Sequence, residues 1–385
     1  MPVYNCWAEI DLDALQANAA ALQGLGSILM AVVKADAYGH GVDLIVPALI
    51  RCGVRDFGVA TAAEGKRVRA IVGRVPRIYV MTAVTAADAP QIIESNLTPF
   101  LGGADIAGEL GRAADAANKT IDVHVEVDSG IGRAGALPDE ASQIVSLILQ
   151  THGLRLTGIC THFTWGENAT DARLQHAVFE DVLERIPNET LAGLTIHAAN
   201  SPAILNVRGA RYTMIRPGLL LYGIAPTGGA SPNMPDGTLL APVLSLRARV
   251  LSVRRLPAGT TLSYGRTFPL ERDATIATVG IGYGDGYSRR FSNIGHVLLP
   301  GGALAPIRGR VCMDQICVEI PDDSALTAGD FVTVVGKSGS SELQAADLAD
   351  EIGATPHEIP TCLTSRVPRI AKMTATNPPG LSIER

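Results

Sequence analysis

Short apolar runs alternate with longer amphipathic stretches over residues 27–222 of this chain. Helical periodicity fills the intervening segments, for example residues 11–22, 61–71, 138–150 and 171–186. This alternation is typical of a parallel sheet wrapped by helices, and eight such units favour a closed (β/α)8 barrel of the TIM type. The eight runs with strand character begin near Ser27, Asp56, Pro76, Leu97, Ile121, Leu156, Leu194 and Tyr212.

The pattern changes after Tyr222. Residues 227–237 are mostly turn formers and are typical of a linker. Beyond them, residues 343–352 have the pattern of a helix, whereas short β-type runs punctuated by Gly and Pro occupy residues 243–253, 275–280, 296–299, 305–309, 316–320 and 331–335. We therefore expect a barrel domain at residues 1–234 and a mostly β domain at 235–385, and the first ten residues or so can join the second domain.

Composition narrows the class of function. The chain has 385 residues, of which 47% are hydrophobic and 18% charged, and its formal net charge is −6. Without long Lys/Arg runs, this charge argues against a nucleic-acid partner and favours chemistry on a small molecule. The six cysteines form no C-x-x-C pair, so we expect reduced thiols and no metal site. The sequence shows neither an apolar signal segment nor a stretch long enough to span a membrane, and we expect a cytoplasmic protein.

Polar residues follow the predicted strands where barrel enzymes place their active sites, at the C-terminal strand ends. Lys34 follows the first strand, residues 128–133 the fifth, and Thr161 with His162 end the sixth. Residues 199–201 end the seventh strand, and residues 216–218 lie at the eighth. Each of these alone is an ordinary strand-end residue. Together they predict one site at the mouth of the barrel.

Lys34 is the leading candidate for covalent chemistry. The apolar run at residues 28–33 stops at this lysine, and a turn rich in Asp, Gly, Tyr and His follows. Apolar surroundings disfavour the ammonium form, so such a lysine can act as a nucleophile toward a carbonyl. A solvated lysine after a strand is the alternative.

Tyr264 lies in a polar, glycine-containing turn of the second domain. A packed aromatic is the simpler interpretation. Removing a proton from one face of a carbon and returning it to the other requires two acid/base groups, however, and a lysine opposed by a tyrosine is one workable pair.

Two further segments are candidates for phosphate binding. The glycine run at 280–286 matches neither the dinucleotide fingerprint nor the P-loop. The segment Asn200, Ser201 and Pro202 is a good helix start, with Ser201 as the cap and Pro202 at the first helical position. Capping explains this segment about as well as phosphate binding at the helix N-terminus does.

With these residues in view, the chain closely resembles the alanine racemases nearly end to end. The resemblance rests on ordered motifs at residues 7–12 (WAEIDL), 127–130 (VDSG), 161–163 (THF), 199–201 (ANS), 216–218 (RPG), 263–265 (SYG), 282–287 (GYGDGY), 311–314 (VCMD) and 366–369 (RVPR), together with the Lys34 segment. It implies a pyridoxal 5′-phosphate enzyme that interconverts L- and D-alanine and supplies D-alanine for cell-wall peptidoglycan.

The resemblance also implies roles. Lys34 would hold the cofactor as a Schiff base and act as one base, and Tyr264 would be the other base, reaching the cofactor of a partner subunit in a homodimer with shared active sites. Arg216 would face the pyridine nitrogen and, because a guanidinium keeps its proton, leave that nitrogen unprotonated. The other residues that the resemblance places at the cofactor are Tyr38, His162, Asn200, Ser201, Gly218, Leu219 and His357, and those that it places at the substrate are Arg133, Tyr283 and Met313.

Two positions depart from the family pattern. Glu126 stands where many members carry a lysine that is often carbamylated, and a glutamate could supply the same negative charge to orient Arg133. His357 replaces a tyrosine beside the phosphate, which leaves a racemase with broader specificity for serine and alanine as the alternative function. A decarboxylase with the same two domains and a non-catalytic cofactor-binding barrel are further alternatives, which Arg216 and Tyr264 respectively disfavour.

Overall fold

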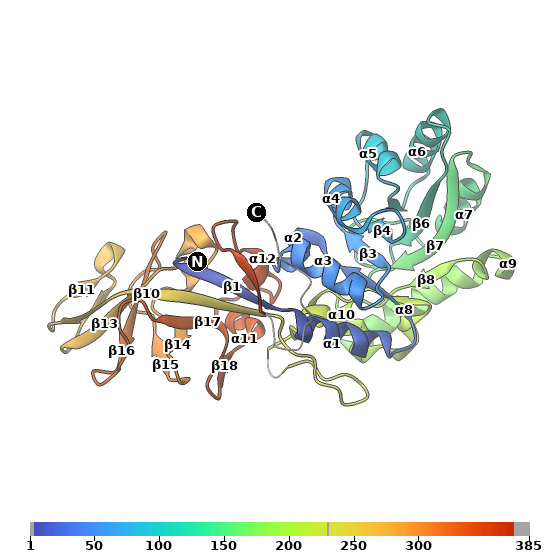
Figure 1. Cartoon of the computed structure of the whole chain (residues 1–385). Coiled ribbons are helices and arrows are strands. Elements are labelled where there is room, and N and C mark those ends of the chain that lie inside the picture. Colours follow the sequence, from blue (N-terminus) through green and yellow to red (C-terminus); the bar gives the residue numbers. More distant parts are fainter. Residues whose placement is uncertain (1–3, 229–230, 373–385) are drawn as a thin grey trace. The chain divides into compact units, whose positions relative to one another are not determined.

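The computed structural model describes residues 4–228 and 231–372, which fall into two compact units (Figure 1). The barrel unit comprises Asn18–Leu221 and Asn233–Leu240. The β unit comprises the described residues within Met1–Ala17, Tyr222–Pro232 and Ala241–Arg385. Each unit is described by itself below.

Eight parallel strands close into a barrel in the described part of the barrel unit. Each strand pairs with the next along the chain, and pairing of Ile28 with Met214 and of Leu29 with Ile215 joins the last strand to the first. This confirms the barrel expected from the alternating pattern. The strands are β2 (Ile28–Val32), β3 (Asp56–Val59), β4 (Arg77–Val80), β5 (Thr98–Leu101), β6 (Ile121–Val127), β7 (Leu154–Thr161), β8 (Thr195–His197) and β9 (Met214–Ile215).

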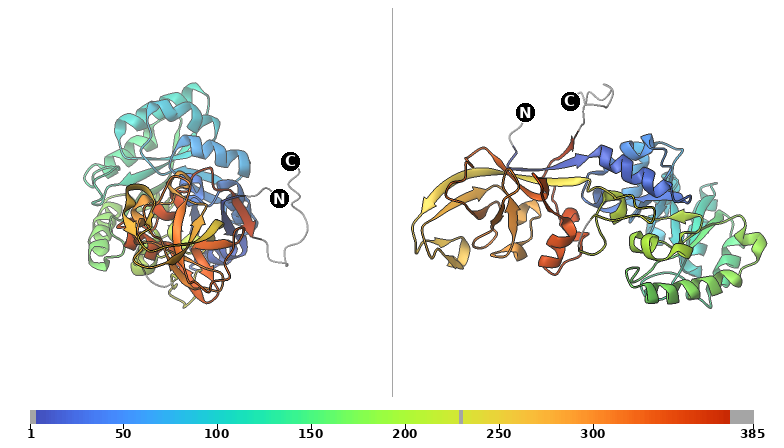
Figure 2. Two further views of the ribbon diagram at one scale, coloured as in Figure 1. Left: turned by 90° about the vertical axis from the view of Figure 1, so that its left-hand side faces the viewer. Right: turned by 90° about the horizontal axis from the view of Figure 1, so that it is seen from below.

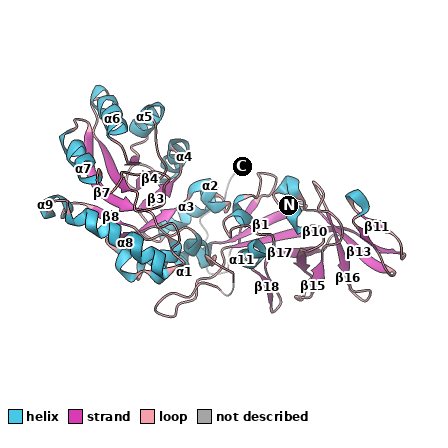
Figure 3. Cartoon of the chain, turned by 180° about the vertical axis from the view of Figure 1, so that it is seen from behind, coloured by secondary structure: helices cyan, strands magenta, loops and turns pink. Residues whose placement is uncertain are grey.

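Helices surround these strands, as Figures 2 and 3 show. They are α1 (Leu12–Gln23), α2 (Lys34–Tyr38), α3 (Val42–Arg51), α4 (Ala62–Val72), α5 (Ala89–Glu94), α6 (Ala104–Ala116), α7 (Ala141–Gln150), α8 (Ala169–Glu184), α9 (Asn188–Leu191) and α10 (Ser201–Asn206). Barrel strands are covered on both faces, which explains their almost continuous apolar runs. Met30, Tyr79, Phe100, Cys160 and Met214 pack together as one buried cluster. Over the described residues, no helix combines the length and apolarity that a membrane crossing would demand.

The β unit is built on a sheet with nine strands among the described residues. Its main order is β15-β14-β17-β10-β1-β19, and β13, β16 and β18 branch from it. The bounds are β1 (Cys6–Asp11), β10 (Leu244–Leu256), β13 (Ala274–Val279), β14 (His296–Leu298), β15 (Leu304–Pro306), β16 (Ile316–Ile320), β17 (Phe331–Ser338), β18 (Ser341–Leu343) and β19 (Arg369–Lys372). Strands β11 (Thr261–Leu262) and β12 (Phe268–Pro269) form a separate hairpin. The mostly β character predicted for this part of the chain is thus confirmed.

The single helix expected over residues 343–352 differs in detail. Leu343 belongs to β18 and pairs with Gly336, so the helix α11 begins later and covers Ala345–Glu351. A second short helix, α12 (Glu358–Thr361), was not predicted. Its four residues are too few for a helical period to be visible in the sequence.

Candidate active site

Lys34 lies directly beyond β2 and opens α2, which is a left-handed turn. The φ angles of Ala35, Asp36, Ala37 and Tyr38 are 52°, 54°, 56° and 53°. Left-handed helical geometry costs L-residues roughly 1–2 kcal/mol each, and such residues usually occur singly. Four in succession require contacts from the rest of the unit to hold them.

Glu64, at the start of α4, supplies one such contact. Its Oε1 accepts a hydrogen bond of 2.8 Å from the backbone N–H of Ala35, and its Oε2 accepts one of 2.7 Å from that of Ala60. Glu64 also forms a capping box with Thr61. The first residue after Lys34 is therefore tied to the N-terminus of the neighbouring helix.

Asp36 and His40 hold the other end of the turn. The Oδ1 of Asp36 accepts a 3.0 Å hydrogen bond from the N–H of Val42. The Nδ1 of the fully buried His40 lies 3.0 Å from the carbonyl oxygen of Ala37 and 2.8 Å from that of Tyr38. Because carbonyl oxygens only accept, His40 carries its proton on Nδ1.

The surroundings of Lys34 disfavour its ammonium form. Burial lowers the pKa of Lys34, and the positive charges of Arg133 and Arg216 lower it further, while Glu64 acts in the opposite direction. A lysine with a lowered pKa more readily offers an unprotonated amine to a carbonyl.

Arg216 follows β9 and is 3% exposed. Its Nη2 donates to the carbonyl oxygens of Thr161 at 2.7 Å and Ala198 at 3.1 Å, and lies 3.3 Å from Nδ1 of His162. Its Nη1 lies 2.6 Å from Nδ1 of His197. The third nitrogen, Nε, carries an N–H that is buried and meets no hydrogen-bond partner within the described residues. A buried N–H without an acceptor fits a ligand that brings one, such as the ring nitrogen of a pyridine.

The helix α10, which precedes β9 in the chain, has a different N-cap from the predicted one. Asn200, not Ser201, is the N-cap, and its side chain accepts a hydrogen bond from the N–H of Ala203. The Oγ of Ser201 instead accepts hydrogen bonds from the N–H groups of Gly218 at 3.0 Å and Leu220 at 3.2 Å. The prediction that Ser201 caps the helix was wrong because these two amides occupy its hydroxyl.

Tyr38, Ser201 and Gly218 form one polar corner. A Cβ placed on Gly218 would lie 2.2 Å from Oη of Tyr38, so the tyrosine hydroxyl rests against the glycine backbone. Leu219 follows Gly218 and begins a 3₁₀ turn, Leu219–Tyr222. A hydroxyl, a second hydroxyl and a close backbone approach at one point suit a phosphate group.

Glu126 and Arg133 belong to the same electrostatic neighbourhood. Glu126 is 5% exposed on β6, and burial raises the pKa of its carboxyl group whereas Arg216 and Arg133 lower it. The loop that carries Arg133 folds back onto β6, since the N–H of Ala136 donates to the carbonyl oxygen of Glu126 at 2.7 Å. Asp128 supports the same loop by accepting from three successive backbone N–H groups.

The β unit carries the other predicted catalytic residue. Tyr264 begins a 3₁₀ turn, Tyr264–Arg266, after Ser263, whose φ is 60°. The Oγ of Ser263 donates to the carbonyl oxygen of Arg310 at 2.6 Å and lies 3.2 Å from Sγ of Cys312. These contacts join the Tyr264 turn to the segment that contains Met313.

Tyr283 and Met313 lie on that joined surface. The N–H of Tyr283 donates to the carbonyl oxygen of Cys312, and that of Gly284 to the carbonyl oxygen of Met313. Tyr264 is 70% exposed, Met313 50% and Tyr283 44%. The β unit thus brings three predicted site residues together on an exposed surface.

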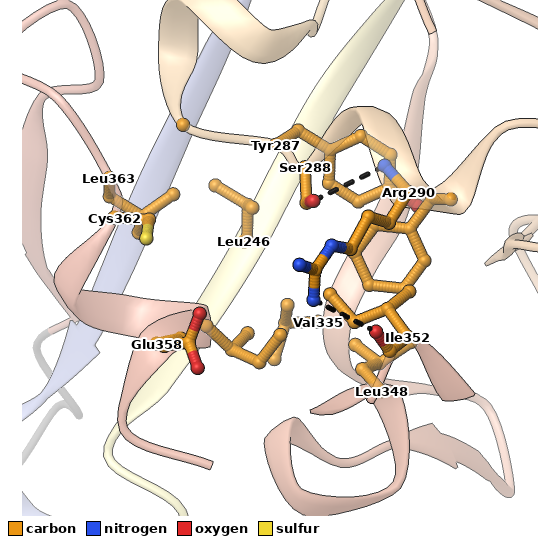
Figure 4. Close-up of a pocket in the computed structure, with 13 residues that line it drawn as sticks. Leu246, Tyr287, Ser288, Arg290, Val335, Leu348, Ile352, Glu358, Cys362 and Leu363 are labelled. Carbon is orange, nitrogen blue, oxygen red and sulfur yellow. Dashed lines mark hydrogen bonds between the residues drawn. The ribbon is translucent and has the colours of Figure 1, made fainter. Parts of the chain in front are cut away.

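His357 precedes α12, and its carbonyl oxygen accepts hydrogen bonds from the hydroxyl and the N–H of Thr361. The adjoining Glu358 and Cys362 line a largely apolar pocket of about 80 Å³ within the β unit (Figure 4). The described lining of this pocket includes no residue predicted for the site. Leu348 of α11 and Ile359 of α12 form part of its wall, and it is not the site predicted from the sequence.

Several residues around the site were not predicted from the sequence. Glu64, Asp36 and His40 hold the turn after Lys34, and His197 contacts Arg216. His197 was visible as a polar residue in a short apolar run that ends a strand. A histidine at that place is unusual enough in a buried strand to have been a signal.

Comparison with known proteins places this geometry in a family. The family model for the N-terminal domain of alanine racemase matches residues 10–226, and that for the C-terminal domain matches residues 243–371. The chain belongs to the alanine racemase family. An alanine racemase of Halothermothrix orenii is 36% identical over 369 residues, which cover 94% of this chain and 96% of that protein. One from Carboxydothermus hydrogenoformans is 34% identical and covers 94% and 98% of the two chains.

Solved structures of the alanine racemase family agree. The alanine racemase of a Streptomyces lavendulae that produces D-cycloserine has a TM-score of 0.87 at 31% identity, covering 97% of this chain and 98% of that one. The alanine racemase of Bartonella henselae, solved with covalently bound pyridoxal phosphate, has a TM-score of 0.84 at 29% identity and covers 96% and 100%. The family therefore includes at least one structure in which pyridoxal phosphate is covalently bound.

Proposed function

We propose that this chain is a pyridoxal 5′-phosphate-dependent alanine racemase that uses Lys34 and Tyr264 as its two bases. Racemase activity on alanine follows from membership of the family. The observation that best supports the cofactor is the buried Nε–H of Arg216, which meets no acceptor among the described residues and lies near a lysine whose pKa is lowered.

The residues fit the cofactor at both ends. Lys34 would hold it covalently, Arg216 would donate to its ring nitrogen, and Tyr38, Ser201 and Gly218 would hold its phosphate. When bound, the cofactor withdraws electrons from the Cα–H bond of the amino acid and so acidifies that proton. Arg216 limits this withdrawal because a guanidinium does not pass its proton to the ring nitrogen.

The protein then has to move a proton across the Cα atom. The amine of Lys34 serves one face and the hydroxyl of Tyr264 the other, and which of them removes the proton depends on the enantiomer. Burial lowers the pKa of Lys34, which raises the share of its amine that can accept a proton. Arg133 would bind the substrate carboxylate, with Glu126 orienting it.

Deuterium wash-in tests the reaction and the substrate together. L-alanine, D-alanine and L-serine are incubated separately in heavy water, and the deuterium at Cα and the enantiomer ratio are followed by mass spectrometry and chiral chromatography. We expect exchange and inversion from both alanine enantiomers. Release of carbon dioxide without inversion would refute the racemase, and faster turnover of serine would favour the broader-specificity alternative that His357 raises.

Tyr264→Phe tests the two-base assignment. Removing one acid/base group should lower turnover by roughly 10²–10⁴-fold while the cofactor stays bound to Lys34. Tyr4→Phe, at another exposed tyrosine of the β unit, is the matched control and should keep normal turnover. Equal activities of the two variants would remove Tyr264 from the mechanism.

We also propose a homodimer in which Tyr264 of one copy serves the Lys34 site of the other. The exposure of Tyr264, Tyr283 and Met313 supports it, since exposed substrate-binding groups need a covering surface. Mixing inactive Lys34→Ala and Tyr264→Phe chains tests it. Random exchange of a two-fold dimer should restore about a quarter of the sites, because half of the dimers are mixed and each mixed dimer has one intact site. Failure to recover activity in an exchanging dimer would refute shared sites.

A further inference from the structure

A line of three buried side chains runs inward from Arg216. Its Nη1 lies 2.6 Å from Nδ1 of His197, and Nε2 of His197 lies 2.7 Å from Nδ1 of His124. Arg216 is 3% exposed, His197 0% and His124 1%. No carboxylate forms a salt bridge with Arg216 among the described residues. For its hydrogen bonds the guanidinium therefore depends on uncharged acceptors, of which His197 is the nearest.

The positions of the protons along this line follow from chemistry. A guanidinium has only donors, so Nδ1 of His197 accepts and its proton must be on Nε2. That N–H points to His124, whose Nδ1 must then accept as well, and His124 carries its own proton on Nε2. Hydrogen bonds thus run in one direction, from Arg216 through His197 to His124.

Both imidazoles have to be neutral for this arrangement. A second proton on His197 would place its Nδ1–H against the N–H of Arg216, and a second proton on His124 would place its Nδ1–H against the Nε2–H of His197. Burial, followed by the charge of Arg216, lowers the pKa of His197 well below the ordinary range. Burial, together with the charges of Arg77 and Arg216, lowers the pKa of His124 to about 3.

The ring of His124 is held in one orientation by its neighbours. Phe100 stacks against it with centroids 5.6 Å apart and planes 3° apart, and Tyr79 lies at 5.1 Å. On β7, Gly158 faces His124 across the strand pair, and a Cβ there would lie 2.4 Å from Cε1 of the imidazole. The acceptor Nδ1 is consequently fixed toward His197.

We propose that His124 is a positioning residue for the cofactor-facing Arg216. By accepting a hydrogen bond from His197, it selects the tautomer in which His197 accepts from Arg216. This hydrogen bond holds the guanidinium in place, with its Nε–H available to the ring nitrogen of the cofactor. Without that acceptor the proton of His197 can move to Nδ1, which puts an N–H against Nη1 and displaces the guanidinium. The inference rests on the proposed function in one respect, the pairing of Arg216 with the ring nitrogen.

Two substitutions separate the acceptor from the packing. In His124→Asn the amide oxygen takes the place of Nδ1 and keeps an acceptor, whereas His124→Leu fills a similar volume without one. Both variants and the wild type are loaded with pyridoxal 5′-phosphate labelled with nitrogen-15 in the ring, and the chemical shift of that nitrogen and the dissociation constant of the cofactor are measured. We expect His124→Leu to shift the ring-nitrogen resonance and to weaken cofactor binding about tenfold, the value of one buried hydrogen bond. His124→Asn should stay close to the wild type in both.

Equal changes in the two variants would mean that His124 acts through packing alone and would overturn the proposal, as would an unchanged His124→Leu. If the leucine variant does not fold, the nitrogen-15 signals of histidines in the wild-type apoenzyme decide the question. We expect His197 and His124 to be neutral with the proton on Nε2, and a proton on Nδ1 of either ring would overturn the proposal. A wild type that bound no cofactor would refute the proposed function, while the histidine signals would still report on the hydrogen bonds from Arg216 through His197 to His124.

Discussion

Gly158→Ala is a severe test of how tightly the barrel interior is packed. The new Cβ would lie 2.4 Å from Cε1 of His124 and 2.6 Å from each ring nitrogen. The imidazole cannot retreat, because Phe100 stacks on one side and Tyr79 lies against it. Overpacking of this kind costs about 1–3 kcal/mol. A displaced His124 also loses its hydrogen bond to His197, which adds about 1 kcal/mol.

Gly58→Ala is the matched control. It adds the same methyl group to another barrel strand, where the Cβ would lie 2.5 Å from Sδ of Met81 and 3.2 Å from Sδ of Met30. Thioether side chains are flexible and can move aside, so the cost there should be smaller.

Calorimetry of both variants decides between these costs. With about 2–4 °C lost per kcal/mol for a unit of this size, Gly158→Ala should lower the melting temperature of the barrel unit by about 5–15 °C. Gly58→Ala should lower it by about half as much or less, because only side-chain rearrangement is needed. If Gly158→Ala melted with the wild type, or no earlier than Gly58→Ala, the rigid placement of His124 would be wrong.

Further outcomes are expected at Lys34, Glu126 and Ser201. In the apoenzyme, Lys34 should react with an amine-selective acylating reagent at a lower pH than exposed lysines do. Glu64→Gln should move that pH lower still, because Glu64 is the group that raises the pKa of Lys34. Peptide mass spectrometry at a series of pH values measures both effects. Since the folded-state pKa is lowered, the unfolded chain binds more protons just below the ordinary lysine range, and this group should make stability rise with pH in that window. Glu126→Gln should lower kcat/KM for alanine about tenfold, because it removes the charge that we propose orients Arg133, and unchanged kinetics would remove that role. Ser201→Ala leaves two amides without their acceptor and should weaken cofactor binding by about tenfold, which titration of the apoenzyme would reveal.

The period of the apolar runs was enough to predict the barrel and to place Lys34 and Arg216 at strand ends, because barrel strands are buried on both faces and stop where the chain turns polar. The turn after Lys34 could not be predicted. Ala, Asp, Ala and Tyr disfavour left-handed geometry, and Glu64, which holds its first residue, stands 29 positions away. Local preference and tertiary contacts disagree there, and the contacts prevail.

The roles within a segment were equally hidden. Asn200 and Ser201 are both good caps, and only the position of the amides of Gly218 and Leu220 decides which one serves. The line from Arg216 to His124 depends on the register of strands β6 to β9, which apolar patterning does not determine to the single residue. The assignments of Lys34 and Tyr264 as bases stay predictions for the experiments above.

The left-handed turn after Lys34 bears on the transfer of this chemistry to other barrels. A lysine grafted at the end of a strand would bring the amine but not the backbone path that leads away from it, since Asp36 and His40 hold that path from within the segment and Glu64 holds it from the helix α4. A designed barrel would need the first turn of α4 together with the whole segment from Lys34 to Val42. The smallest part of this site that could be transferred is therefore a pair of adjacent βα units. The reactive lysine by itself would not be sufficient.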